Sequence, residues 1–391
     1  MAEWQTVRLG NIIKTNQNTY SPKESWKLIN YLDTGNITMN RVEKIHYINT
    51  VSDKLPSRAR RKVKRDSIIY STVRPNQLHY GIIKEQPDNF LVSTGFTVID
   101  VNSEKTVPDY IYYVLTQQGV IEHLQAIAEQ SVSAYPSIKP SDIENLDVSL
   151  PDIDTQKRIV SILSTIDKKI AQNTQINNNL EQQAKVLYKD WFFDYSPFSD
   201  DGTLPDDWRI GTVGDIIQLH DSKRVPLSKA ERDKMAKIYP YYGATSLMDY
   251  VDNYLFDGIY LLLGEDGTVV DSLGFPILQY VYGQFWVNNH AHIITGKEGF
   301  SVEELYLFFS LTNIKSIVTG AVQQKVSQQN LKKVPAVIPS KEALSAFDEL
   351  IHPIFTQIRN LREENVRLAE LRDTLLPKLM SGELDVSDIE L

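Results

Sequence analysis

The chain has 391 residues, of which 42% are apolar and 23% are charged, with no cysteine and a net charge of −9. This length predicts at least two domains, each with its own core. The lack of cysteine excludes disulfides, thiolate zinc sites and a cysteine nucleophile. No apolar run reaches the roughly 18 residues of a membrane span, and Met1–Trp4 lacks signal-peptide features, so we expect no membrane partner and a cytoplasmic protein. The acidic balance argues against a nucleic-acid partner, but over half of the negative excess lies outside the globular parts.

Short strand-like runs bounded by Gly and Pro, mixed with amphipathic stretches, predict an α+β fold. In chain order we expect strands at Ser67–Tyr70 and Phe96–Ile99, a helix at Tyr110–Glu122, a strand at Ile143–Leu150, strands at Tyr260–Leu263 and Ala291–Thr295, and a helix at Val302–Leu311. Gly264–Gly267 is more typical of a tight turn than of a phosphate loop, and the acidic tail after residue 380 is expected to be loosely ordered.

An internal repeat organises these elements. Trp4 and Gly10 recur 204 positions later as Trp208 and Gly214, and Leu150 recurs 188 positions later as Ile338. A repeat of this kind predicts a duplicated order of module, long helix, module, long helix. The expected segments are a recognition module at 1–151, a central helix at 152–198, a second module at 199–339, a second helix at 340–380 and a tail at 381–391.

Both long helices carry a heptad seam, in which apolar residues alternate at steps of four and three. Asparagine interrupts the seam at positions 173, 177 and 365. Because each helix must bury one stripe, we expect the two to pair as an intramolecular antiparallel coiled coil related by a pseudo-twofold repeat. The apolar seam residues are Ile159, Leu163, Ile166, Ile170, Leu180, Leu187, Phe347, Ile351, Ile354, Ile358, Leu361, Leu368 and Leu375.

Motifs of catalysis are scarce. The sequence has no P-loop, no GxSxG elbow, no HExxH and no GxGxxG. Pro151-Asp152 followed by Asp167-Lys168-Lys169 formally resembles a nuclease PD…DxK pattern, but Asp167 falls inside the heptad helix rather than at a sheet edge. His290 and His292 lie on one side of a predicted strand. Without an obvious third ligand they favour DNA contact, local polar contacts or a structural role, and we expect no metal on this chain.

Basic residues interleaved with aromatic and amide side chains are the candidates for DNA contact, with arginine suited to guanine and asparagine to adenine. The alternatives are a solvated loop in the first module, and a charged helix followed by a core aromatic turn in the second. The candidates in the first module are Arg58, Arg60, Arg61, Lys62, Lys64, Arg74, Asn76, His79 and Tyr135. Those in the second are Lys223, Arg224, Tyr241, Tyr242, His290, His292, Gln323, Gln324 and Lys325.

Two of these groups lie at corresponding places, just before the strand that leads into each long helix. Gln323-Gln324-Lys325 corresponds in this way to Ser133-Ala134-Tyr135, which indicates matched recognition loops.

The seam from residue 159 to residue 187 spans roughly 42 Å at about 1.5 Å per residue. One turn of B-DNA is about 34–36 Å, so two modules at opposite ends of the helices would meet successive turns of a duplex.

The chain resembles the specificity subunits of Type I restriction-modification systems over almost its whole length. The resemblance rests on the module openings at Trp4 and Leu204–Trp208, on Leu150-Pro151 with Gln156–Ile159, on Asp190–Phe198, on Asn288–His292 and above all on Leu371–Glu383. A departure is the second helix, where Leu344 and Phe347 replace the family's Gln-x-x-Ile start.

The resemblance implies a non-catalytic subunit whose two target recognition domains each read one half of a bipartite, asymmetric sequence in double-stranded DNA. The helices would set the unread spacer and, with Trp191–Phe198, dock two methyltransferase subunits. The family's S-adenosylmethionine belongs to those partners, and ATP with magnesium belongs to restriction subunits, which are further expected partners. The alternative is a coiled-coil scaffold with protein-binding modules.

Overall fold

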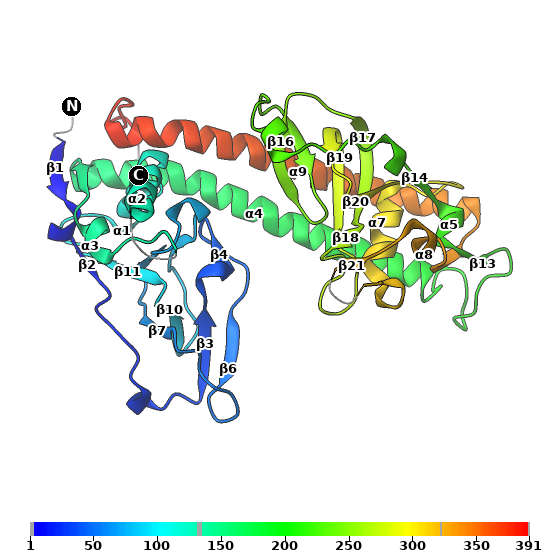
Figure 1. The fold of residues 1–391 in the computed structure, drawn as a ribbon, viewed down its shortest axis with the longest axis horizontal. Coiled ribbons are helices and arrows are strands. Elements are labelled where there is room, and N and C mark those ends of the chain that lie inside the picture. The colour runs from blue at the N-terminus through cyan, green and yellow to red at the C-terminus, as the bar shows by residue number, and fades with distance from the viewer. Residues whose placement is uncertain (1–3, 131–134, 321–322, 390–391) are drawn as a thin grey trace. The chain divides into compact units, whose positions relative to one another are not determined.

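The computed structural model describes residues 4–130, 135–320 and 323–389, which form two compact units. The first unit comprises Met1–Ala171 and Asn365–Leu391, and the second comprises Gln172–Glu364. The long helices α4 (Ile153–Phe192) and α9 (Lys341–Ser381) each contribute one stretch to either unit (Figure 1). Within the described ranges, no helix combines the length and apolarity needed to cross a membrane.

The first unit contains an antiparallel sheet, a mixed sheet, the two short pairs β1–β12 and β4–β5, and three helices outside α4 and α9. One sheet has the strand order β2-β11-β8-β9, a second has the order β6-β3-β10-β7, and β1 pairs with β12. The strands are β1 (Gln5–Arg8), β2 (Ile13–Thr15), β3 (Leu28–Leu32), β4 (Ile37–Thr38), β5 (Arg41–Val42), β6 (His46–Asn49), β7 (Ala59–Lys62), β8 (Ile68–Ser71), β9 (Tyr80–Ile82), β10 (Phe90–Ser93), β11 (Phe96–Val101) and β12 (Asp147–Leu150). The helices are α1 (Pro108–Leu115), α2 (Gln118–Glu129) and α3 (Pro140–Glu144).

The second unit is built around one larger sheet with the strand order β14-β20-β17-β19-β15-β16. Two short pairs, β13 with β22 and β18 with β21, complete its strands. The strands are β13 (Arg209–Thr212), β14 (Ile217–Leu219), β15 (Tyr239–Tyr242), β16 (Leu247–Val251), β17 (Phe256–Gly264), β18 (Asp266–Gly267), β19 (Leu278–Val287), β20 (Ala291–Gly296), β21 (Gln324–Lys325) and β22 (Pro335–Ile338). The helices are α5 (Val213–Ile216), α6 (Lys229–Arg232), α7 (Val302–Leu311) and α8 (Gln328–Leu331).

The two units repeat one another in topology, as the sequence repeat predicts. The order β2-β11-β8-β9 returns as β14-β20-β17-β19, with antiparallel pairing throughout. The terminal pairs even share their register, because Gln5 faces Leu150 in β1–β12 and Arg209 faces Ile338 in β13–β22. These partners are related by the same offsets of 204 and 188 that relate the sequence motifs. The units therefore share a core and differ in what surrounds it.

In the first unit, the start of α4 and the end of α9 pack together in one hydrophobic cluster. Ile159 and Leu163 of α4 share this cluster with Leu376 and Leu379 of α9. The helices run antiparallel there, because the later α4 residue Ile170 accepts a hydrogen bond at its carbonyl oxygen from the earlier α9 residue Asn365.

The second unit shows the complementary pairing. Tyr188 and Phe192 near the end of α4 contact the ring of Phe347 near the start of α9, at centroid distances of 5.6 and 4.8 Å. Asn173 near the middle of α4 donates a hydrogen bond to Glu364 at 2.9 Å, so the order of contacts is again antiparallel. All predicted seam residues on both helices are buried or half-buried.

Three expected elements differ from those observed. The helix expected at Tyr110–Glu122 is divided into α1 and α2, because Gln117 adopts an extended conformation (φ −64°, ψ 137°) between them. The strand expected at Ile143–Leu150 is shorter, since α3 takes up its beginning. The C-terminal tail is not loose in its described part: Val386 is buried in the core of the first unit.

Candidate nucleic-acid interface

The basic run of the first module forms strand β7 and its flanks, paired antiparallel with β10. Two of its lysines are engaged within the protein. Lys62 forms an ion pair with Glu24, and its ammonium group lies 4.9 Å from the centre of the Trp26 ring. Lys64 lies 3.8 Å from the carboxylate of Asp100 but keeps 62% of its side chain exposed. These contacts leave Lys64 accessible and make Lys62 part of the strand's own support.

The three candidate arginines of this run, Arg58, Arg60 and Arg61, differ in accessibility. Arg58 is exposed and Arg60 is half-buried, and neither forms an ion pair among the described residues. Arg61 is half-buried, and its Nε atom is buried without a hydrogen-bond partner in the described chain. Burial lowers the pKa of the Arg61 guanidinium. Arg60 in β7 and Arg58 just before it are therefore the arginines best placed for a phosphate contact.

A second group lies in the loop that follows β8. Arg74 is exposed and its guanidinium lies 5.7 Å from the centre of the Tyr135 ring, which is 63% exposed. The backbone N–H of Arg74 donates to the carbonyl of Pro136, and that of Asn76 donates to Gln125 Oε1 at 3.3 Å. The structure thus brings together Arg74, Asn76 and Tyr135, which are 61 positions apart at the extremes. Ser133 and Ala134, the neighbours predicted with Tyr135, lie outside the described residues.

His79 ends the same loop and is half-buried. Its Nδ1 atom lies 2.7 Å from the carbonyl oxygen of Ile37 and 3.4 Å from the hydroxyl of Thr38. Since the carbonyl can only accept, Nδ1 carries a proton and ties the loop to the hairpin β4–β5. His79 therefore supports the loop, and only its other ring edge remains for a ligand.

The corresponding loop of the second module is the short strand β21, which pairs with β18. Gln323, Gln324 and Lys325 are all exposed there. The ammonium group of Lys325 lies 3.5 Å from Glu265, and His290 Nδ1 lies 2.6 Å from Asp266. This loop presents amides and a partly neutralised cation, whereas the loop of the first module presents a guanidinium on an aromatic ring.

Lys223 and Tyr242 complete the candidates that remain accessible in the second module. Lys223 is exposed, with no ion pair in the part of the chain that the structure describes. Tyr242 is half-buried with its ring edge-on to Phe285, and burial raises the pKa of its hydroxyl. Tyr242 therefore stays neutral at physiological pH and can act as a hydrogen-bond donor.

Three predicted DNA contacts are corrected by the structure. Tyr241 is only 1% exposed, with its hydroxyl accepting a hydrogen bond from the backbone of Leu227. His292 is 0% exposed, and Arg224 keeps only 13% of its side chain exposed between two carboxylates. Their hydrogen-bonding groups are used inside the unit, so they hold the surface in place rather than contact a duplex.

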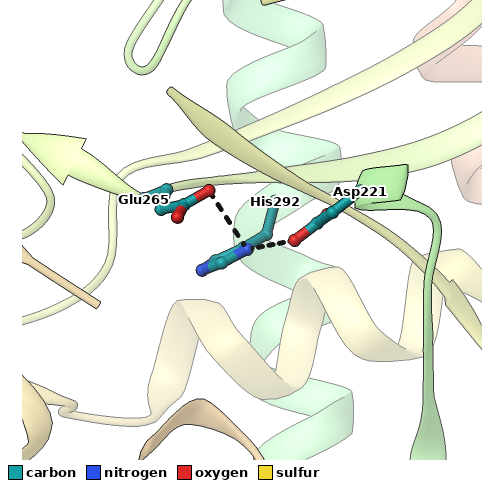
Figure 2. Close-up of side chains that lie close together, drawn as sticks. All are labelled: Asp221, Glu265 and His292. Carbon is teal, nitrogen blue, oxygen red and sulfur yellow. Dashed lines mark hydrogen bonds and ion pairs between the residues drawn. The ribbon is translucent and has the colours of Figure 1, made fainter. Parts of the chain in front are cut away.

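His292 belongs to a charged cluster with Asp221 and Glu265 (Figure 2), and Arg224 pairs with both carboxylates. His292 Nδ1 lies 2.6 Å from Asp221 Oδ2 and 3.8 Å from Glu265 Oε2, while its Nε2 lies 2.8 Å from the carbonyl oxygen of Val326. Arg224 lies 2.6 Å from Glu265 and 3.6 Å from Asp221. Burial opposes ionisation of Asp221, but the hydrogen bond and charge of His292 outweigh it and hold the pKa of Asp221 below its ordinary value.

The carboxylates and the imidazole offer three atoms within 4.8 Å of one another, which is compatible in spacing with a metal site. In this structure the same groups are engaged with one another and with Arg224. The Nδ1 atom of His292 is already paired with the carboxylate of Asp221, and its Nε2 atom donates to the carbonyl oxygen of Val326. Arg224 adds a positive charge where a cation would lie. The cluster is best described as an internal ion network that holds β17, β20 and β21 together.

Sequence reasoning missed Asp221 and Glu265 as members of this network. Asp221 lies 71 positions before His292, and Glu265 lies in the stretch predicted as a tight turn. No local pattern marks either residue, because the sheet order alone brings them together. The nearest signal was the pair of histidines at positions 290 and 292.

The nuclease-like pattern also has a structural use. Asp152 caps the start of α4, where it accepts hydrogen bonds from the backbone and hydroxyl of Thr155, both at 2.8 Å, and these lower the pKa of Asp152. Asp167 accepts from the Tyr113 hydroxyl at 2.7 Å and from Arg372 at 3.0 Å. Fifteen residues along one helix separate the carboxylates by roughly 22 Å, so they cannot share a metal ion.

Comparison with known proteins places the chain in a family. The family model described as the Type I restriction modification DNA specificity domain matches residues 1–182 and 205–371. The HindI specificity subunit of a Type I restriction enzyme from Haemophilus influenzae is 24% identical, over 98% of this chain and 100% of that protein. The MjaIX specificity subunit from Methanocaldococcus jannaschii is 25% identical, over 79% of this chain and 76% of that protein.

A solved structure supports the fold independently. The S subunit of a Type I restriction-modification system from M. genitalium aligns with 97% of this chain and 96% of its own, at a TM-score of 0.55 and 15% identity. At that identity the likeness concerns the fold alone. The match of the family model extends over both modules and most of both long helices, and the chain therefore belongs to the family of Type I restriction-modification specificity subunits.

Proposed function

We propose that this chain is the sequence-specific DNA-recognition subunit of a Type I restriction-modification complex. The observation that carries the proposal is the duplicated match of the DNA specificity domain, once at residues 1–182 and once at 205–371. The two matched regions coincide with the repeated sheet order β2-β11-β8-β9 and β14-β20-β17-β19. Each repeat serves as one target recognition domain.

The two domains read different half-sites, which makes the target bipartite and asymmetric. Support comes from the parts in which the units differ. The sheet β6-β3-β10-β7 with its basic strand belongs to the first unit, while β15 and β16 extend the main sheet of the second. The loops before the long helices also differ, with Arg74 beside Tyr135 in one and Gln324 beside Lys325 in the other. Different side chains at corresponding positions read different bases.

The long helices set the length of the unread spacer and dock two methyltransferase subunits. Support for docking comes from apolar side chains that the helices leave exposed. These are Ile176 and Val186 on α4, and Leu350, Val366 and Leu371 on α9. In this proposal the methyltransferase subunits cover these side chains. In this proposal the chain has no active site of its own, and S-adenosylmethionine, ATP and magnesium bind to the methyltransferase and restriction subunits.

The proposal is tested with the full chain copurified with its methyltransferase subunits. Mobility shifts on a randomised duplex library should select one two-part sequence, with affinity that falls steeply as salt rises because phosphate contacts release counterions. Binding that shows no sequence preference at moderate salt would refute it. The alternative of a scaffold with protein-binding modules predicts a complex indifferent to DNA, and the family match does not support it.

A further inference from the structure

Backbone hydrogen bonds show which residues of one segment in the first unit are equivalent to which residues in the second unit. In the first unit, the N–H of Ile138 donates to the carbonyl of Thr72, and Val73 forms a bridge with Ser137. In the second unit, the N–H of Val326 donates to the carbonyl of Glu265, and Asp266 pairs with Lys325. Each segment directly follows an inner strand of the main sheet, β8 or β17. Two positions after the carbonyl acceptor, Arg74 and Gly267 are therefore equivalent.

Both equivalent residues have a left-handed backbone. Gly267 has φ +89°, a conformation that glycine adopts without steric cost. Arg74 has φ 48° and ψ 71°, where the Cβ atom of an ordinary residue is strained. Pro75 follows, and a residue before proline favours an extended backbone instead. The shared fold thus calls for glycine at this position, yet the first unit holds an arginine there.

The surroundings hold this arginine rigidly and keep its side chain accessible. The N–H of Arg74 donates to Pro136, its carbonyl accepts from Gln77, and the ring of Pro75 is buried. The guanidinium has no carboxylate partner among the described residues, and the exposed ring of Tyr135 lies 5.7 Å away. A strained backbone that presents an unpaired, prepositioned functional group is typical of a binding site.

We propose that Arg74 is the specificity-determining residue of the first unit and that it reads a guanine in the half-site bound there. The inference rests on the proposed function of DNA recognition. The guanidinium fork donates two parallel hydrogen bonds to O6 and N7 of guanine in the major groove, and Tyr135 supports its plane from one side. A phosphate contact would not need this residue, because a lysine or arginine on an unstrained backbone, such as Arg58, supplies the same charge.

The second unit lacks a side chain at the position equivalent to Arg74, because Gly267 lies there. Gly267 has no side chain, and an added Cβ atom there would meet no atom within 4 Å. The space that Arg74 fills in the first unit is therefore left open in the second, whose loop offers the side chains of Gln323, Gln324 and Lys325 instead. Only the first half-site is expected to depend on a residue at this position.

The test compares three variants in the full chain bound to its methyltransferase subunits, by selection and sequencing of bound duplexes. Arg74→Lys keeps the charge but loses the two-pronged geometry, and Arg74→Gly restores the residue that the backbone favours. Both should lose the preference for guanine at one base pair of one half-site by about 5- to 100-fold, with the other half-site unchanged. Arg58→Ala is the matched control, which should weaken binding to all sequences alike.

The possible failures are distinct. A wild-type complex without sequence preference would overturn the proposed function itself. A specific wild-type complex whose preferences survive both Arg74→Lys and Arg74→Gly would overturn only the role of Arg74. A uniform loss of affinity in both variants, like that of Arg58→Ala, would also overturn it by showing a phosphate contact. Since Arg74→Gly removes strain, thermal unfolding of this variant at or above the wild-type temperature separates lost recognition from lost folding.

Discussion

Replacing Glu304 with glutamine should stabilise the second unit, and increasingly so as pH rises. Glu304 lies in the first turn of α7, where one carboxylate oxygen accepts a hydrogen bond from the backbone of Ser301 at 2.7 Å. The other oxygen is buried without a partner in the described chain, and the residue is 0% exposed. Burial, reinforced by the nearby carboxylates of Asp348 and Glu303 and opposed by the Ser301 hydrogen bond, raises the pKa of Glu304 to about 8.

The magnitude follows from the difference between this pKa and the ordinary value of 4.5. The folded state holds the proton more tightly, so the stabilising contribution is complete below pH 4.5 and is lost as pH rises to about 8. At 1.36 kcal/mol per tenfold change in proton affinity, the free energy of unfolding falls by about 5 kcal/mol over the whole window, with about 3 kcal/mol lost by pH 7. Glutamine stays neutral and can still accept the Ser301 hydrogen bond, so the variant should escape this loss.

The assay is urea unfolding of wild type and Glu304→Gln at pH 5, 7 and 9, followed by circular dichroism. The two proteins should unfold at similar urea concentrations at pH 5 and diverge progressively above it, with the variant more stable. Glu303→Gln is the matched control, because Glu303 binds Arg359 at 2.8 Å and the Tyr280 hydroxyl at 2.6 Å. Weakening that pair should destabilise the unit by about 3 kcal/mol. A difference between wild type and Glu304→Gln that does not change with pH would refute the reasoning.

Three further outcomes are expected. Asp167→Ala leaves the largely buried Arg372 without its main partner and should lower the free energy of unfolding by about 3 kcal/mol, which thermal unfolding measures. Because Asp167 serves this ion pair and not a nuclease site, the substitution should not change any metal-dependent cleavage of DNA. Inserting four residues after Asn177, about one helical turn, should change the spacing of the recognised half-sites, and unchanged spacing in a folded, active variant would contradict the helices' role as spacer. Titration of the protein with zinc should show no binding that depends on His292. His292→Ala should instead lower the stability of the second unit, because it removes the partner of Asp221. If wild type bound zinc and His292→Ala did not, the assignment of these residues to an internal ion network would be contradicted.

Features with a local signal were predictable from the sequence. The helix predicted at Val302–Leu311 has those bounds in the structure, because Ser301 and Glu304 form a capping box that marks its start. The repeat offsets of 204 and 188 predicted the duplicated order of modules and helices, and the same offsets relate the residues that face one another in the two terminal strand pairs. The division between α1 and α2 was missed because an unbroken amphipathic pattern carries no sign of a turn at Gln117.

The accessibility of charged side chains was not predictable. Arg224 and Arg74 were both candidates for DNA contact on the basis of the sequence. Arg224 proves to be enclosed by Asp221 and Glu265, while Arg74 is exposed against Tyr135. Of these partners, only Asp221 is close to its arginine in sequence, and sequence proximity alone does not report enclosure.

The sequence by itself determined the duplicated order of modules and long helices, because heptad periodicity and repeated motifs are properties of the chain read in order. It also identified the family resemblance that the comparisons confirm. Only the tertiary structure decided which candidates face outward, that Glu304 is buried, and that Arg74 occupies a position where its counterpart is glycine. Those properties depend on groups brought together by strand pairing across tens of residues, and burial and backbone strain arise only once that pairing is complete.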